Sequence, residues 1–364
     1  MDNKNFAMLF YGKVLPLLRP VQIRAIMTMK EGYAAMIPTY YLETSSTDPA
    51  YNLAVEEYAL THFREGNLLM LWQNAPSVII GRNQNTAEEI NQDFVNSHNI
   101  RVVRRNTGGG AVYHDLGNLN YSFITDVDGT DRQTYERFVL PIVSALVDLG
   151  LDACSSGRND ILVSGKKVSG TAQQILKGRI LHHGTLLFDT DAGMIQGALN
   201  PDPEKFRSKS VKSVRSRVGN IRSFLSVDMM VDRFWEHLKS FFLVSDAQQI
   251  ELTPDDLQAI VELKEKKYDT WEWNYGRSPK CQIQSKNRYE GGSLDIRFSV
   301  ESGKITEIHI FGDYLAVKPI EELEERLIGC ERREDSLMSA LEDVDLSEYL
   351  GTITIQELIH TICN

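Results

Sequence analysis

The sequence predicts an α/β (α+β) protein with a large domain of mixed, mostly antiparallel sheets flanked by helices and a small α/β C-terminal domain. Short β-branched runs alternate with segments of helical periodicity, and most turns between strand-like runs are too short for a crossover helix. A chain of 364 residues has room for two domains at roughly 100–200 residues each. The pattern of strands and helices restarts near residue 285, so we expect domains over 37–280 and 285–364.

The elements of the large domain follow from capping residues and apolar periodicity. Asp48 offers an N-cap with Pro49 at the first helical position, which predicts a helix to about residue 63. Thr86 with Glu89 three residues later matches a capping box that opens a second helix. A third helix is expected over 135–149, and strand-like runs occur at 68–72, 78–80, 100–104, 111–113, 119–124, 161–163 and 181–188.

In the small domain, the alternating apolar residues of 294–298 and 305–310 predict two strands. Pro319 opens a helix with acidic residues in its first turn. The last helix starts at Thr354, with Glu357 as its capping-box partner.

Composition excludes several classes of protein. With 39 Lys and Arg against 50 Asp and Glu, the formal charge of −11 disfavours nucleic-acid binding through bulk positive charge. A hydrophobic content of 42% excludes disorder as the main state. We expect no membrane-spanning helix, because no apolar run reaches ~18 residues.

The cysteines and the N-terminus bear on cellular location. Cys154, Cys281, Cys330 and Cys363 stand far apart, without a CxxC pair, which predicts a reducing, cytoplasmic environment. Residues 1–36 are basic and poor in acids. We expect an N-terminal extension outside the fold, with a targeting segment as the alternative.

The stretch RRNTGGGAVYHDLGN over residues 104–118 says most about function. Three glycines without Cβ atoms allow the backbone to approach a ligand closely and to point N–H groups at phosphate or carboxylate oxygens. The adjacent Arg104 and Arg105 offer planar donors to the same anion. A glycine-lined bulge beside two surface arginines is the alternative, which the HDxGN turn makes less favoured.

Two further stretches carry charged or ring nitrogen groups. Asp160 could hold Mg²⁺, which takes oxygen ligands and usually bridges substrate phosphates. Lys167 could place a cation between a carboxylate oxygen and an α-phosphate, where charge develops during acyl transfer. His182 and His183 are neighbours on a predicted strand, so at most one of them faces a given pocket. No third ligand has the spacing of a zinc site.

Taken in this order, these stretches resemble the lipoate–protein ligase A family within the wider biotin/lipoate ligase group. The family's RRxxGGGxVxHDxGN pattern, KxxG(S/T)A pattern and HHGTLL strand are present unaltered, and residues 79–85, 213–218 and 271–276 also match. The resemblance runs from about residue 37 to the C-terminus. It differs at Gln174, where some members have an arginine near the lipoate pocket.

The resemblance implies an ATP-dependent reaction in two steps. Lipoate and MgATP give enzyme-bound lipoyl-adenylate and pyrophosphate, and a lysine of the acceptor protein then attacks the acyl carbon and releases AMP. The implied acceptors are lipoyl domains of 2-oxoacid dehydrogenase complexes and the glycine-cleavage H protein. We expect the enzyme to act as a monomer.

Residue by residue, the resemblance implies Lys167 as the catalytic residue, contacting both the acyl carbonyl and the α-phosphate. It implies ATP and adenylate binding by Lys167, Arg105, Asp160, Gly108, Gly109, Gly110, Ala111, Val112 and Tyr113. Lipoate binding falls to Lys167, Trp72, Arg82, Thr107 and His183. The magnesium ligand implied is Asp160.

Two other functions remain open from the sequence. An octanoyl or lipoyl transferase of the same superfamily would use a cysteine thioester without ATP, and Cys154 lies thirteen residues before Lys167. A non-catalytic relative that only binds lipoyl domains would be expected to lose the lysine or the glycines, which are intact here. A biotin ligase is a weaker alternative.

Overall fold

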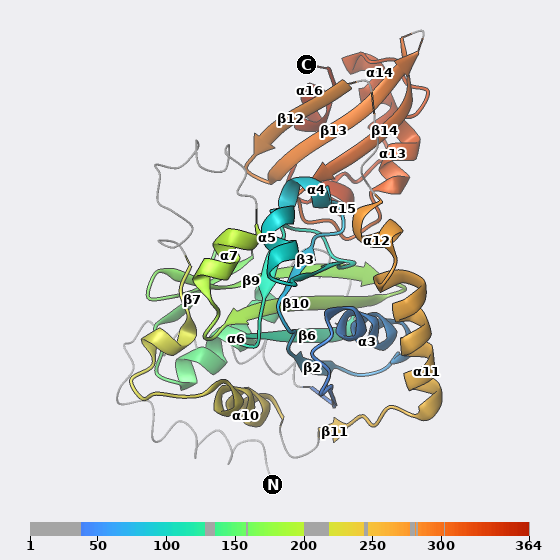
Figure 1. The fold of residues 1–364 in the computed structure, drawn as a ribbon. Helices are drawn as coiled ribbons and strands as arrows, with labels where there is room; N and C mark the ends of the chain where they lie inside the picture. The colour runs from blue at the N-terminus through green and yellow to red at the C-terminus, as the bar shows by residue number, and fades with distance from the viewer. Residues whose placement is uncertain are drawn as a thin grey trace.

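The fold is that of a computed structural model, shown in Figure 1. The structure describes residues 38–127, 135–157, 159–199, 218–243, 247–276, 281, 283–301 and 303–363. The expected N-terminal extension, residues 1–36, lies outside this part of the chain. The boundaries at 280 and 285 stay predictions.

An eight-stranded sheet with the order β11-β1-β2-β6-β10-β9-β8-β7 forms the centre of the large domain. Its strands are β1 (Tyr40–Glu43), β2 (Leu68–Trp72), β6 (Asn118–Asp126), β7 (Ala153–Ser156), β8 (Asp160–Val163), β9 (Lys166–Leu176), β10 (Arg179–Leu187) and β11 (Gln248–Gln249). Parallel pairing is confined to β11, β1 and β2, and the other described neighbours in this sheet are antiparallel. The predicted mixed, mostly antiparallel architecture is confirmed.

A second sheet of the large domain carries the segment that contains Gly108, Gly109 and Gly110, called the glycine segment below. β3 (Ser77–Ile80) lies between β4 (Arg101–Arg104), which is parallel to it, and β5 (Val112–His114), which is antiparallel. The glycine segment connects β4 to β5, and β5 leads directly into β6 of the large sheet. The segment is therefore held at the junction of the two sheets.

Helices cover both faces of the large sheet. Alternate strand residues point to opposite faces, so each face presents its own side chains to the helices that pack on it. On one face, Leu69 and Leu71 share a core with α6 (Glu136–Asp148) and α10 (Val231–Phe242). On the other face, Leu68 and Met70 pack with α3 (Pro49–His62) and α11 (Pro254–Leu263). Shorter helices of this domain are α4 (Thr86–Glu89), α5 (Gln92–Ser97), α7 (Ala192–Ala198) and α12 (Trp271–Tyr275), with a 3₁₀ turn at Ile221–Phe224.

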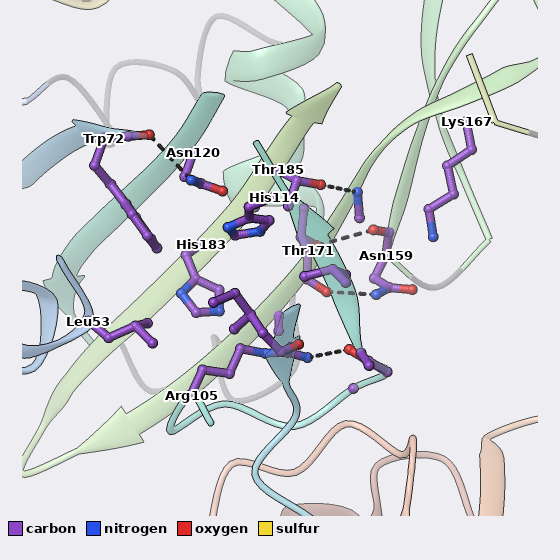
Figure 2. Close-up of a pocket in the computed structure, with 18 residues that line it drawn as sticks. Leu53, Trp72, Arg105, His114, Asn120, Asn159, Lys167, Thr171, His183 and Thr185 are labelled. Carbon is purple, nitrogen blue, oxygen red and sulfur yellow. Dashed lines mark hydrogen bonds between the residues drawn. The ribbon is translucent and has the colours of Figure 1, made fainter. Parts of the chain in front are cut away.

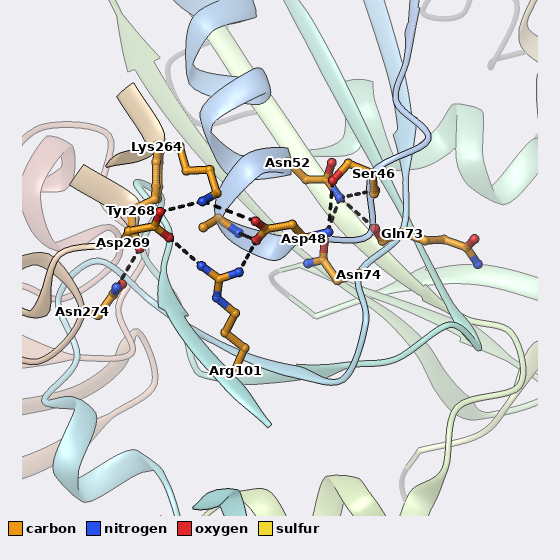
Figure 3. A network of polar contacts seen from close by, with 11 residues as sticks. Ser46, Asp48, Asn52, Gln73, Asn74, Arg101, Lys264, Tyr268, Asp269 and Asn274 are labelled. Carbon is orange, nitrogen blue, oxygen red and sulfur yellow. Dashed lines mark hydrogen bonds and ion pairs between the residues drawn. The ribbon is translucent and has the colours of Figure 1, made fainter. Parts of the chain in front are cut away.

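The start of α3 is fixed by a cap and by a charged network. The Asp48 side chain accepts a hydrogen bond from the Ala50 N–H at 2.9 Å, and Pro49 is the first helical residue, which confirms the predicted cap. Arg101 on β4 pairs with Asp48 at 2.7 Å, and Lys264 joins the same carboxylate at 3.5 Å (Figure 3). Lys264 begins a π-helical turn, Lys264–Tyr268, that continues α11. The network therefore ties α3, β4 and α11 together on one side of the domain.

The C-terminal domain has its own core. A three-stranded antiparallel sheet of β12 (Ile283–Tyr289), β13 (Gly292–Glu301) and β14 (Lys304–Gly312) packs on α13 (Glu321–Leu327), α14 (Glu334–Leu341), α15 (Ser347–Leu350) and α16 (Ile355–Cys363). Thr354 and Glu357 form the predicted capping box at the start of α16. In Figure 1 this domain, in orange, stands beside α4 of the large domain.

One predicted helix start is wrong. Thr86 does not cap a helix with Glu89; its hydroxyl donates to the Asn274 carbonyl oxygen at 2.5 Å, and Asn85 occupies the N-cap position. The expected helix is split into α4 and α5, because Ile90 pairs with Leu199 as an isolated β-bridge between them. A tertiary contact therefore overrides the local capping pattern. None of the helices in the described ranges combines the length and the apolar character needed to cross a bilayer.

Candidate active site

A pocket lies between the glycine segment, α3 and strands β6, β9 and β10 (Figure 2). The pocket brings together the amine-bearing side chain of Lys167 and the backbone of Gly109 and Gly110. Lys167 follows these two glycines by nearly sixty residues in the chain. The side chains and backbone groups that line it are Leu53, Trp72, Ile79, Arg105, Gly109, Gly110, Ala111, Val112, His114, Asn120, Asn159, Lys167, Gly170, Thr171, Ala172, His183, Gly184 and Thr185.

The glycine segment is packed tightly on one side and open on the other. A Cβ atom on Gly81 would lie 1.9 Å from the Gly109 carbonyl oxygen, so the two backbones meet in a space that only glycine leaves. Gly109 has a φ of +88°, in the region that favours glycine. A Cβ atom on Gly110 would meet nothing within 4 Å. The backbone at Gly110 therefore faces empty space in the pocket.

Arg105 holds this loop from within. Its guanidinium donates to the Gly108 carbonyl oxygen at 2.6 Å and to the Gly110 carbonyl oxygen at 2.9 Å, and its Nε donates to Thr107 Oγ1. Burial lowers the pKa of Arg105 to about 10, against the attraction of Glu56. Most of the N–H groups of the Arg105 guanidinium therefore bind the loop itself.

Arg104 is turned away from the pocket. It is fully buried and donates to the backbone carbonyl oxygens of Gly81, Arg82 and Gln84. The prediction that Arg104 and Arg105 both offer donors to one anion is therefore wrong for Arg104. Arg104 instead fastens the loop after β3 to β4.

Lys167 and Asp160 lie on neighbouring strands at the mouth of the pocket. The Lys167 Nζ atom is 2.7 Å from Asp160 Oδ1. The register between β8 and β9 shifts here, so that Ile161 faces Ser169 while Leu162 faces Lys167. Such shifts are common next to binding sites, and the Lys167 side chain beside this one lines the pocket.

A chain of buried polar side chains forms one wall. His183 Nε2 lies 2.8 Å from Thr107 Oγ1, and His183 Nδ1 lies 2.8 Å from Glu56 Oε1. Ser122 donates to the same carboxylate oxygen and accepts from Trp72 Nε1 at 2.9 Å. The chain links α3, β2, β6, β10 and the glycine segment, and so fixes the wall of the pocket.

Only one residue of the histidine pair faces the pocket, as strand alternation requires. His183 lines it, whereas His182 is fully buried on the opposite face of β10 and stacks on Phe138 with ring centroids 4.7 Å apart.

Two models of known protein families match the chain. The lipoyl protein ligase A/B catalytic domain matches residues 48–243, and the bacterial lipoate protein ligase C-terminus matches residues 278–362. The chain belongs to the lipoate–protein ligase family.

Relatives are similar along nearly their whole length. Lipoate–protein ligase 1 of Staphylococcus aureus is 45% identical over 315 residues, which cover 86% of this chain and 96% of the relative. Lipoate-protein ligase LplJ of Bacillus subtilis is 44% identical over 320 residues, covering 86% and 97%. This ligase family member is therefore similar to these relatives over almost all of their length.

Solved structures show the same fold. Plasmodium falciparum LipL1 in complex with lipoate superposes with a TM-score of 0.73 at 25% identity, covering 89% of this chain and 99% of that one. A bipartite ligase of Thermoplasma acidophilum, from a study with its E2 lipoyl domain, gives 0.59 at 34% identity, covering 68% and 100%. A lipoate-protein ligase A bound with ATP gives 0.56 at 31% identity, covering 66% and 99%.

The expected site residues of the ligase divide into two groups in the structure. Those that line the pocket are Trp72, Arg105, Gly109, Gly110, Ala111, Val112, Lys167 and His183. Asp160 and Thr107 are not part of this lining but contact it, Asp160 through Lys167 and Thr107 through His183. Tyr113 points away into the small core around β3, and Gly108 lies against the C-terminal domain, where a Cβ atom would be 2.7 Å from the Tyr314 carbonyl oxygen.

The C-terminal domain reaches the rim of the site. The Gly109 N–H donates to the Tyr314 carbonyl oxygen at 3.0 Å, and the Gly312 N–H donates to the Asn83 carbonyl oxygen at 2.9 Å. Arg82 lies outside the pocket lining and pairs with Glu321 on α13 at 3.4 Å. In this arrangement the ligase joins Gly109 and Arg82 to the accessory domain.

Several lining residues were not singled out from the sequence. Asn159 donates to the Thr171 carbonyl oxygen at 2.6 Å, and Thr185 Oγ1 accepts from the Gly170 N–H at 3.3 Å. Both threonines lie inside the quoted motifs, and Asn159 precedes Asp160, so proximity to a motif is a usable signal. Leu53 on α3 carries no such signal.

The thiol of Cys154 is exposed on β7 and does not line the pocket. All four cysteines are free. Gln174 is on β9 outside the lining, and its Oε1 atom is buried without a hydrogen-bond partner among the described residues.

Proposed function

We propose that this protein is an ATP-dependent lipoate–protein ligase that forms lipoyl-adenylate and transfers the lipoyl group to a lysine of an acceptor protein. The observation that carries the proposal is that the Lys167 side chain and the open backbone at Gly110 face one pocket. A cation beside a backbone that leaves room for close approach suits the negative charge of a carboxylate joined to a phosphate.

The pocket has an apolar and a polar end. Leu53 and Trp72 lie on one side of Figure 2, and Lys167 and Asn159 lie on the other. Apolar walls suit the hydrocarbon tail and ring of lipoate, and a few polar groups fix its orientation. We place the lipoyl tail towards Trp72 and the carboxylate at Lys167.

In the first step, a lipoate carboxylate oxygen attacks the α-phosphorus of ATP, and the bond to the β-phosphate oxygen breaks to release pyrophosphate. The Lys167 ammonium stabilises the charge that develops on the carboxylate and the α-phosphate. In the second step, the acceptor amine attacks the acyl carbon, the bond to the phosphate oxygen breaks, AMP leaves and the nitrogen loses a proton. The protein contributes positioning and the exclusion of water.

Asp160 fits a magnesium site in one respect. Mg²⁺ often binds through one carboxylate together with substrate phosphates, and the Asp160 carboxylate stands beside the amine expected to meet the α-phosphate. Bound there, the ion would neutralise phosphate charge. Asp160 positions the Lys167 amine.

The acceptor, location and oligomeric state are parts of this proposal. Lipoyl domains of 2-oxoacid dehydrogenase complexes and the glycine-cleavage H protein are the acceptors we propose, and the Thermoplasma relative was studied with an E2 lipoyl domain. The free thiols suit a reducing compartment such as the cytoplasm. We propose a monomer as the active form.

A lipoylation assay with a purified acceptor domain tests the proposal, with and without ATP. We expect modification that requires ATP, survives Cys154→Ser and is lost in Lys167→Ala. Modification from an acyl thioester without ATP, abolished by Cys154→Ser, would instead establish a transferase.

A further inference from the structure

A mixed group of side chains that can bind a metal lies in the C-terminal domain, outside the pocket. Cys281 precedes β12, and Glu307 and His309 are on β14. The Cys281 sulfur, a Glu307 carboxylate oxygen and a His309 ring nitrogen all lie within 4.8 Å of one another. In the described ranges of the chain, no other group of three or more His, Cys, Asp or Glu side chains comes this close together.

The sheet of the C-terminal domain assembles this group. Glu307 and His309 are two residues apart on one strand, so both side chains point to the same face of the sheet. Ile308 and Ile310 point to the other face and pack in the core of the domain. Cys281 comes from the segment before the first strand of the sheet. The group therefore lies on the face opposite the core, and tertiary structure rather than sequence spacing creates it.

The chemistry of the three ligands fits zinc. A thiolate, an imidazole and a carboxylate are the ligands that Zn²⁺ takes in proteins, whereas Mg²⁺ and Ca²⁺ prefer oxygen alone. In a tetrahedral zinc site the ligand atoms are roughly 3.3–3.6 Å apart. The observed separations are within about an ångström of this, and the Glu307 side chain, which is 49% exposed, is free to rotate towards an ion.

A carboxylate on the far side of His309 supports the same assignment. His309 Nε2 lies 3.2 Å from Glu307 Oε1, while His309 Nδ1 lies 3.9 Å from Glu324 Oε2 on α13. Glu324 is buried, and its other oxygen accepts a hydrogen bond from the Ile310 N–H at 2.8 Å. Histidines that bind a metal through one ring nitrogen usually present the other to a carboxylate or carbonyl oxygen. We expect the longer contact to shorten when an ion fixes the ring.

A positive charge beside the group is already neutralised. Arg297 on β13 is opposite His309 in the strand register. Its guanidinium pairs with Asp295 at 3.1 Å and also contacts the Glu88 carboxylate. Two carboxylates around one guanidinium leave this surface with negative charge, to which Glu307 adds. The surroundings therefore favour a cation.

We propose that Cys281, Glu307 and His309 bind one zinc ion, with Glu324 orienting His309 and a water molecule at the fourth position. The Cys281 thiol loses its proton to solvent as the bond from sulfur to zinc forms. Cys281 comes a few residues after α12, the last helix of the large domain. The ion ties the start of the C-terminal domain to the third strand of its sheet. The site is separate from the ligase reaction.

Cobalt(II) tests the site directly, because a thiolate bound to it gives charge-transfer absorption in the near ultraviolet. The sample is the full chain without a histidine tag, freed of metals with a chelator and kept reduced. We expect this absorption to saturate at one cobalt per chain and to disappear when zinc is added. Wild type without the absorption, or with cobalt spectra of oxygen ligands alone, overturns the proposal.

Matched variants locate the ligands. Cys281→Ser should abolish the charge-transfer absorption and lower zinc affinity at least roughly tenfold, measured by competition with a coloured chelator. Cys330→Ser is the control, at another partly buried cysteine of the same domain, and should behave like wild type. Glu324→Gln keeps an acceptor for the Ile310 N–H but should lower zinc affinity roughly tenfold.

Two results with the variants contradict the assignment: wild-type cobalt binding by Cys281→Ser, or loss of the absorption in Cys330→Ser. Zinc should also raise the melting temperature of wild type and leave that of Cys281→Ser unchanged, since only a ligand of the folded state stabilises it. An equal rise in both places the ion elsewhere. The cobalt measurement on wild type decides the proposal even where a variant fails to fold.

Discussion

Lys167 and Asp160 face each other from β9 and β8, with the Lys167 Nζ atom 2.7 Å from Asp160 Oδ1 and side chains that are 39% and 33% exposed. An ion pair of this exposure contributes roughly 0–1 kcal/mol to stability. The ammonium can therefore exchange the carboxylate for ligand oxygens at small cost. We propose that the pair holds the amine at the mouth of the pocket until substrate binds.

This relationship predicts that Asp160→Asn separates activity from stability. We expect the unfolding free energy to change by less than about 1 kcal/mol. We expect kcat/KM for adenylation to fall roughly tenfold to hundredfold, because the amine is less well positioned. Urea unfolding and lipoate-dependent pyrophosphate release measure the two effects. Asp152→Asn, at an exposed carboxylate before β7, is the control, and wild-type adenylation by Asp160→Asn would contradict the role of the pair.

Two glycines in contact with the same loop should respond differently to alanine. Gly81→Ala forces a methyl group to within 1.9 Å of the Gly109 carbonyl oxygen, so we expect clear loss of thermal stability. Gly110→Ala meets no atom within 4 Å and should leave the melting temperature nearly unchanged. Its methyl group projects where the ligand would lie, so adenylation should fall by at least roughly tenfold. A Gly110→Ala enzyme of normal activity would place the ligand elsewhere.

Adjacent glutamates on α3 offer a second matched comparison. Glu56 supports His183 in the pocket wall, whereas Glu57 pairs with Lys267 at 2.8 Å away from the lining. Both Glu56→Gln and Glu57→Gln should cost about 1–3 kcal/mol of unfolding free energy. Only Glu56→Gln should raise KM for lipoate, measured at a temperature where both variants are folded. Equal KM values would show that Glu56 acts on stability alone.

His182 gives the ligase a predictable response to acid. Burial holds the pKa of His182 well below its ordinary value of 6.5. Below about pH 6.5 His182 is protonated in the unfolded chain but stays neutral in the folded protein. The contribution of this group therefore lowers the free energy of unfolding by about 1.4 kcal/mol for each unit by which the pH is lowered. His182→Phe should therefore show a shallower fall in unfolding free energy between about pH 7 and pH 5. Urea titrations across that range with equal slopes would contradict this.

Local signals in the sequence were sufficient for parts of the fold whose interactions are local. The caps at Asp48 and Thr354 join groups within a few residues of each other, and both are present. The cap predicted at Thr86 fails because Asn274, 188 residues away, takes its hydroxyl. β9 is not among the predicted strand-like runs, although it extends from Lys166 to Leu176.

The sequence motifs predicted which segments form the site, but not how their side chains are arranged in space. Arg104 looked like a ligand donor, yet it binds backbone oxygens of the loop after β3. Glu56 meets His183 across 127 residues of sequence, so no spacing rule could pair them. The register shift beside Lys167 is likewise a property of two paired strands.

The most direct measurement is lipoate-dependent exchange between ATP and pyrophosphate, carried out with the full chain. Wild type should exchange only when lipoate is present, and Lys166→Ala, the neighbouring lysine, should behave like wild type. Lys167→Ala should lose at least roughly a hundredfold in exchange rate, the scale of a charge contact removed from a transition state. Exchange by Lys167→Ala at the wild-type rate, or exchange by wild type without lipoate, would contradict the account.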